Sequence, residues 1–276
     1  MTVSPITSMT PEPSVRVETI TPDMAREYLA ANTHNRPVRH RVVAAYARDI
    51  AASKWEWNGE SIKFDRNGVL SDGQHRLLAI IEADTPLKML VIRGLDPLAQ
   101  ETMDGGAKRT FSDVLKLRGE ENYTQLAAGV RLIASWESGD IRKSNIQFTN
   151  TELVETLERH GWIRNGLTTA KRLQSHAGLP SSIGVLLYWL FTQVDTEDAE
   201  FFFARIASSE GHAAGDPAFE LRKALLANDD AKSSASRTYL TAISVKAWNK
   251  YRAGETVGLL RFRMGGARPE PFPEPK

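Results

Sequence analysis

The chain of 276 residues contains no cysteine. Disulfide bonds, thiolate metal sites and cysteine nucleophiles are therefore excluded. It also lacks an apolar run of the roughly 20 residues that a membrane span needs. Residues 1–14 are rich in Thr, Ser and Pro and lack the apolar core of a signal peptide. These absences predict a cytoplasmic protein without a membrane partner.

An excess of charge of one sign is lacking as well. The 35 basic residues are almost matched by 34 acidic ones, so the composition carries no global signature of nucleic-acid binding. Any contact with DNA must come from a local basic patch. What is present suits a globular protein, with 41% hydrophobic and 25% charged residues over a length of one large or two ordinary domains.

The most informative stretch is Gly68–Ile80, which combines a strand, a polar corner and a helix start. The preceding Asn67-Gly68 predicts a two-residue hairpin turn of the primed type between two short strands. Asp72-Gly73 then ends the second strand, and apolar residues recur at helical spacing after it. Gln74-His75-Arg76 is therefore expected on the first turn of a helix.

This placement has chemical content, because the free N–H groups and the positive dipole end of a helix attract anions. An imidazole and a guanidinium on the same turn favour a phosphate group. An alternative stays open at this point: Asp72 caps the helix, His75 and Arg76 are solvated, and Gly73 only makes the turn.

The run Asp72-Gly73-Gln74-His75-Arg76, followed by Leu-Leu-Ala-Ile, resembles the nucleotide-binding corner of the ParB/sulfiredoxin superfamily, in particular phage-type ParB-like proteins with a DGQHR motif. Two looser segments extend the resemblance over residues 15–115. Asn35–Arg39 before a helix is similar to the family's first box. Asp104–Thr110 falls where ParB proteins carry a polar motif that touches phosphates and metal.

The resemblance implies a bound nucleoside triphosphate, ATP or CTP, together with Mg²⁺. It implies that the nucleotide is held by Asp72, Gly73, Arg76, Arg39, Lys108 and Arg109, that Gln74, His75 and Glu60 act in catalysis, and that Asp104 binds the metal. Glu60 would serve as a general base, which needs a carboxylate within reach of the acceptor hydroxyl. The other interpretation of Glu60 is an ordinary exposed glutamate.

Two departures from the family pattern narrow the activity. Sulfiredoxins place a catalytic cysteine directly before the His-Arg pair, where this chain has Gln74, so sulfinic-acid reduction is excluded. Chromosome-segregating ParB proteins show Gly-Glu-Arg-Arg at this corner. Their CTP preference and clamp behaviour therefore do not follow for a corner that carries Gln74 and His75.

The chain is predicted to be α+β, with a small mixed-sheet ParB/sulfiredoxin-like domain at 15–110 and an all-α domain at 111–262. Residues 1–14 are expected to be a disordered lead, and 263–276, with four prolines, an extended tail. The first domain should hold strands at 15–20 and 87–92 and helices from Thr21-Pro22 and over 38–53. Further helices are expected at 110–117, 123–137, 149–160, 162–174, 181–194, 196–209, 217–227 and 234–252.

The helical half carries one hypothesis for DNA binding. In segregation-type relatives a helix-turn-helix follows the nucleotide domain, and Thr149–Gln174 has two short helical segments broken at His160-Gly161. These segments carry Arg159, Arg164, Lys171 and Arg172. Two amphipathic helices joined by glycine are also an ordinary unit of any helical domain.

Together these patterns predict a nucleotide-binding ParB-like protein that acts on or with DNA, by NTP hydrolysis or phosphoryl transfer at the corner. Two alternatives stay open. One is a ParB-like nuclease, which the lack of a dense Asp/Glu/His cluster disfavours. The other is a non-catalytic DNA-binding regulator that keeps only the fold. The expected partners are DNA and nucleotide, with a homodimer as a further candidate.

Overall fold

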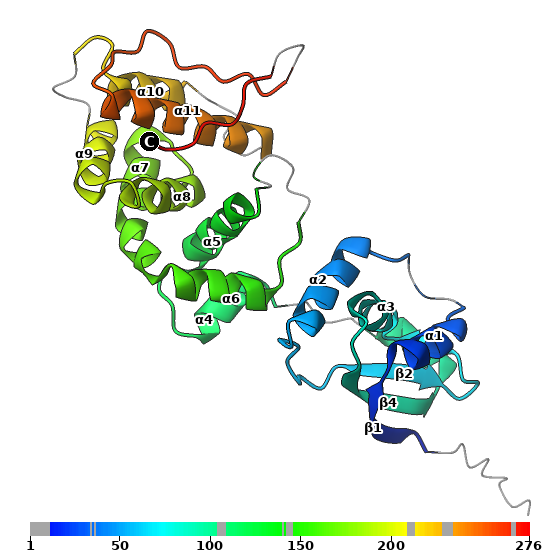
Figure 1. Ribbon diagram of the computed structural model, residues 1–276. Helices are drawn as coiled ribbons and strands as arrows, with labels where there is room; N and C mark the ends of the chain where they lie inside the picture. Colours follow the sequence, from blue (N-terminus) through cyan, green and yellow to red (C-terminus); the bar gives the residue numbers. More distant parts are fainter. Residues whose placement is uncertain are drawn as a thin grey trace, which may run out of the picture. The chain divides into compact units, whose positions relative to one another are not determined.

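The computed structural model describes residues 12–33, 35, 37–103, 109–139, 141, 146–208, 213–227, 234–265 and 269–276. The chain forms two compact units, one up to residue 108 and one from residue 109. The first unit holds a small mixed sheet with helices, and the second is helical (Figure 1). The predicted α+β class, with an all-α second part, is confirmed.

The sheet of the first unit has four strands: β1 (Ser14–Ile20), β2 (Ser61–Asp65), β3 (Leu70–Asp72) and β4 (Leu87–Leu95). Their order is β1-β4-β2-β3. β1 runs antiparallel to β4 and β3 antiparallel to β2, whereas β2 and β4 are parallel. The parallel pair needs a crossover, and the helix that follows β3 supplies it.

Three helices cover the sheet: α1 (Pro22–Ala30), α2 (His40–Ala51) and α3 (Gln74–Ala83) (Figure 1). Thr21 caps α1 by accepting from the Met24 N–H, with Pro22 at the first helical position, as predicted. The core between sheet and helices contains Ile20, Val43, Ile50, Ile62, Phe64, Leu70, Leu77, Ile80, Met89 and Val91. Alternation along β2 and β4 turns these strand residues toward the helices.

The hairpin between β2 and β3 is present, but the predicted primed turn is wrong. The Gly68 N–H donates to the Asp65 carbonyl oxygen at 3.1 Å, and Gly68 alone of the central residues has a positive φ, of 78°. The Asp65 carboxylate accepts from the N–H groups of Asn67 and Val69, both at 2.8 Å. This side chain stabilises a longer turn, which propensity rules for Asn-Gly do not anticipate.

The second unit consists of helices with short connections. They are α4 (Phe111–Leu117), α5 (Tyr123–Glu137), α6 (Asn150–Arg159), the 3₁₀ turn η2 (Gly161–Asn165), α7 (Gly166–Ala177), α8 (Ser181–Thr192), α9 (Thr196–Ala207), α10 (Pro217–Leu226) and α11 (Ser234–Arg252). Each predicted helix is confirmed, except that the segment expected at 162–174 divides into η2 and α7. In the first unit, a further 3₁₀ turn, η1 (Pro97–Thr102), follows β4.

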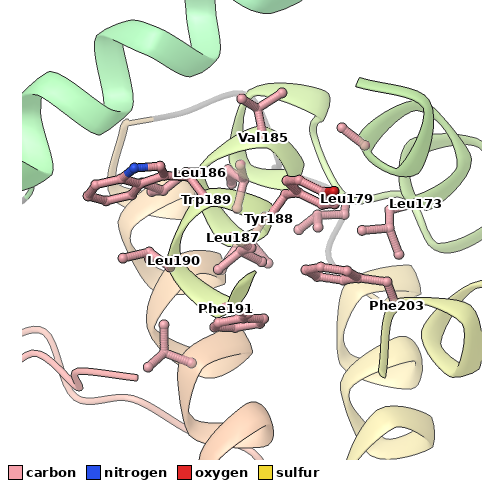
Figure 2. Close-up of a cluster of buried hydrophobic side chains, with 14 of the residues drawn as sticks. Leu173, Leu179, Val185, Leu186, Leu187, Tyr188, Trp189, Leu190, Phe191 and Phe203 are labelled. Carbon is pink, nitrogen blue, oxygen red and sulfur yellow. The ribbon is translucent and has the colours of Figure 1, made fainter. Parts of the chain in front are cut away.

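α8 is the centre of the helical unit. All nine residues of Ile183–Phe191 are buried, so this helix is apolar on every side and must be surrounded. Figure 2 shows its side chains reaching outward in several directions, with Phe203 of α9 and Leu173 of α7 close by. At 12 residues α8 is too short to span a bilayer. Across the described part of the chain, no helix combines the length and apolarity needed to cross a membrane.

The last residues pack on the helical unit without forming a helix or strand. The Phe272 ring lies 5.7 Å from Trp136 and 5.5 Å from Phe262. Glu270 accepts from Lys246 of α11 at 3.0 Å. The expected tail is therefore irregular in conformation, as its prolines indicate, and is also attached to the core.

Candidate functional site

The corner between β3 and α3 depends on one glycine. Gly73 has a φ of 109°, which L side chains rarely adopt, and it stands at the N-cap of α3. A Cβ there would lie 2.5 Å from Ile62 Cδ1 and 3.2 Å from Ile62 Cα on the neighbouring strand β2. The backbone therefore turns tightly from strand to helix, and the first turn of α3 begins directly at the strand end.

A hollow of about 230 Å³ opens at this corner. Its walls come from five segments of the first unit: the loop before α2, α2 itself, the start of β2, the corner and η1. The residues that line it are Asn35, Arg39, Val42, Tyr46, Glu60, Ser71, Asp72, Gly73, Gln74, His75, Arg76, Gln100 and Met103. Seven of the predicted site residues thus lie around one cavity, although Arg39 and Glu60 are distant from the motif in sequence.

The Arg76 guanidinium is held by carboxylates and a carbonyl group. Its Nη1 donates to Glu60 at 2.6 Å, and its Nη2 donates to Asp72 at 2.9 Å and to the Ser61 carbonyl oxygen at 2.8 Å. The side chain is only 11% exposed. The alternative in which Arg76 is solvated is therefore wrong. The neighbouring carboxylates of the protein itself offset the charge of the guanidinium.

Asp72 is the shared partner in this network. Its Oδ2 accepts from Arg76 and also from Lys63 Nζ at 3.0 Å. Burial raises the pKa of this carboxyl, but the Arg76 charge and the Lys63 hydrogen bond outweigh it, and the pKa lies below its ordinary value. With Glu60 included, two cations face two carboxylates, so the network as a whole carries no net charge.

His75 and Gln74 are buried and connect the corner to other segments. The backbone N–H of Arg39 donates to His75 Nε2 at 3.0 Å. The Gln74 side-chain oxygen accepts from Asn32 Nδ2 at 2.7 Å. Both side chains border the hollow, and these contacts tie the segment between α1 and α2 to the first turn of α3. The solvated alternative for His75 is wrong as well.

Arg39 differs from Arg76 because its guanidinium is exposed and has no ion-pair partner among the described residues. Glu60 is exposed too, at 53% of its side chain, and its bond to Arg76 lies at the rim. Among the described residues that line the hollow, the exposed charged ones are therefore the cation Arg39, without an ion-pair partner there, and the carboxylate Glu60.

Two amides of the hollow wall were not predicted as site residues. Asn35 donates to the Leu70 carbonyl oxygen at 2.7 Å, and Gln100 donates to Asn35 Oδ1 and to the Ser71 carbonyl oxygen, both at 3.1 Å. They attach η1 and the loop before α2 to β3. The sequence spacing does not indicate that Gln100 lines the hollow, because only the packing of η1 against β3 brings Gln100 to this position.

Three predicted residues are not among the described residues that line the hollow. Asp104 and Lys108 fall outside the described residues. Arg109 belongs to the second unit, where its carbonyl oxygen accepts from Asn150 Nδ2 at 3.4 Å. Within the described ranges, no three His, Asp or Glu side chains are grouped so that they could hold a metal ion.

The basic residues of the helix-turn-helix hypothesis are mostly paired. Arg159 donates to both carboxylate oxygens of Glu137 at 3.1 Å, Arg164 pairs with Glu120, and Lys171 bonds the Asn122 side chain. Arg172 is exposed on α7. Because Arg159, Arg164 and Lys171 are bonded to other side chains, this segment offers fewer free cations to a phosphate backbone than its sequence indicates.

Comparisons of the chain with protein-family models, with curated proteins and with solved structures returned no match.

Proposed function

We propose that the first unit binds a nucleoside triphosphate, ATP or CTP, with its phosphates over the first turn of α3. The observation that carries this proposal is the hollow at the Gly73 corner, where the N-terminus of a ten-residue helix meets the free guanidinium of Arg39. Helix N–H groups and an arginine are the donors that phosphate oxygens prefer.

The size of the hollow limits how a nucleotide can sit. Pockets that enclose a drug-sized ligand measure about 300–1,000 Å³, and this one is smaller. The triphosphate would occupy the hollow, and the base would lie outside it. Mg²⁺ would bind together with the triphosphate, and Asp104 remains the proposed protein ligand of the metal ion.

The proposed reaction is NTP hydrolysis or phosphoryl transfer in a ParB-like protein that acts with DNA. In this proposal Glu60 serves as the base, because it is the exposed carboxylate at the rim of the hollow. Gln74 and His75 orient the reacting groups from the wall of the hollow at the first turn of α3. DNA would bind through a local basic patch.

A second candidate function is a non-catalytic DNA-associated regulator. The observation that favours it is the engagement of Arg76, His75 and Gln74 in contacts with neighbouring segments, which holds the fold together without a ligand. In that case the corner binds phosphate weakly or binds nothing.

Isothermal titration with ATP, CTP and GTP, each with Mg²⁺, separates the two functions. We expect heat with at least one nucleotide and an affinity about 10- to 100-fold lower in Arg39→Gln, the value of one charge-assisted hydrogen bond. The matched control is Arg131→Gln, another exposed arginine, on α5. The absence of binding heat with all three nucleotides would contradict nucleotide binding. A measurement of inorganic phosphate release then distinguishes an enzyme from a protein that only binds the nucleotide. DNA binding measured at increasing salt concentration tests whether DNA is a partner.

A further inference from the structure

β1 is an edge strand whose outer side is open. It pairs with β4 over all seven residues and with no other strand of the described chain. No other backbone hydrogen bond within the described residues involves Ser14–Ile20, apart from the pairing with β4. A long edge with free N–H and C=O groups is a template for another strand.

The two sides of β1 differ in character. Ile20 is buried in the core and Glu18 accepts from Tyr28 of α1, so the even-numbered residues face the helices. Val15 and Val17 therefore lie on the opposite side, 57% and 51% exposed. Across the pairing with β4 they stand next to Ile92 and Leu90. This apolar stripe lies on the face of the sheet beside the open edge, and contiguous exposed apolar surface is typical of protein–protein contact sites.

We propose that a second copy of this chain binds at the open edge, through antiparallel pairing of β1 with β1 about a two-fold axis at Val17. In that register Val17 faces Val17, Val15 faces Thr19, and Arg16 faces Glu18 of the second copy, whose carboxylate also accepts from Arg93 of its own chain at 2.5 Å. Opposite charges directly across an antiparallel pair are favourable, and β-branched pairs pack well. Two sheets of four strands then become one of eight, closed by the two-fold axis.

Neighbouring registers are worse for a physical reason. Moving the axis to residue 16 places Arg16 opposite Arg16, and moving it to residue 18 places Glu18 opposite Glu18. A shift by a single residue in the pairing puts the helix-facing side of one strand beside the open side of the other. The charge pattern of β1 therefore selects its own antiparallel copy in one register.

The oligomeric mass of the full chain tests the proposal first. Light scattering after size exclusion should give twice the mass of the 30.7 kDa chain. Val17→Lys, which places two like charges at the axis, should give the mass of one chain and keep the far-UV circular dichroism spectrum of the folded protein. The control is Leu98→Lys at another exposed apolar residue, on η1, which should stay dimeric. A monomeric wild type, or a dimer that Val17→Lys leaves intact, would overturn it.

Cysteine substitution tests the register, because the chain has no cysteine of its own. In Val17→Cys the two sulfur-bearing residues face each other with Cα atoms about 4.5–5.5 Å apart, within disulfide range. In Val15→Cys they are displaced by four residues, or about 13 Å. Under mild oxidation Val17→Cys should cross-link much faster than Val15→Cys. Equal rates would contradict the register, and with it the proposed interface. This test does not depend on nucleotide binding.

Discussion

The backbone N–H of Arg39 donates to Nε2 of His75 at 3.0 Å, which joins the residue before α2 to the first turn of α3. Because Nε2 accepts this bond, it carries a lone pair and no proton in this arrangement. The bond also fixes where the Arg39 side chain leaves the backbone, beside the hollow. His75 thus positions Arg39, the exposed cation that lines the hollow among the described residues.

A pair of His75 variants isolates this bond. His75→Gln keeps an acceptor near the position of Nε2, whereas His75→Leu is apolar and leaves the Arg39 N–H without a partner. We expect the Leu variant to be about 1–3 kcal/mol less stable than the Gln variant, the cost of an unsatisfied buried donor. Urea unfolding measures the difference. Equal stabilities would show that the bond contributes nothing to the fold.

In the proposed nucleotide complex, Glu60 would compete with the triphosphate for Arg76, to which it is bonded at 2.6 Å. Its side chain is half exposed, and exposed ion pairs contribute only about 0–1 kcal/mol. Glu60→Gln should therefore raise the affinity for a triphosphate by about two- to fivefold, and abolish turnover if Glu60 is the base. The control is Glu82→Gln, which removes the same charge near the far end of α3. A lower affinity in Glu60→Gln would mean that the carboxylate contacts the ligand favourably, for example through its metal ion.

Gly73 should tolerate no side chain. Gly73→Ala meets a positive φ and a contact of 2.5 Å to Ile62, whereas Gly68→Ala meets a positive φ of 78° and open space. Backbone strain alone costs about 1–3 kcal/mol, so both variants lose stability. Gly73→Ala should lose at least about 1 kcal/mol more, since the packed β2 strand must shift. Denaturant midpoints of the two alanine variants test this, and equal losses would remove the collision as the reason for glycine.

The Asp72 carboxylate makes stability depend on pH. Burial opposes its ionisation, but Arg76 and Lys63 more than compensate, so its folded-state pKa lies below the unfolded value near 3.8. A depressed pKa stabilises the folded protein above the unfolded value, and this contribution is lost as pH falls through the folded pKa. Asp72→Asn should therefore be about 1–3 kcal/mol less stable than wild type near pH 7. This difference in stability between Asp72→Asn and the wild type should disappear as the pH falls below about 4. A gap that stays constant with pH would show that the charge of Asp72 does not matter.

Local patterns predict much of this protein because they act over a few residues. Thr21-Pro22 places the start of α1, and the periodicity of Tyr123–Glu137 matches α5 from end to end. The strand, glycine and helix of the 70–76 corner follow from neighbours in the chain. The primed turn predicted at Asn67-Gly68 is wrong because the Asp65 side chain, and not the Asn-Gly pair, supplies the hydrogen bonds that stabilise the turn.

The partners of the corner could not be read from spacing. Arg76 is 16 positions from Glu60 in sequence, and only the start of β2 beside the corner brings carboxylate, carbonyl and guanidinium together. Arg39 reaches the same hollow because its backbone bonds His75. Such contacts depend on how α2 and β2 pack around α3, which no local rule encodes.

By itself, the sequence determined the fold class, the helices and the glycine corner, because propensity, capping and periodicity are properties of short segments. Tertiary structure alone decided which charges at the corner are paired and which is free. Those pairings join residues from separate elements, and their energies arise only after the sheet register and helix packing have set the distances between them.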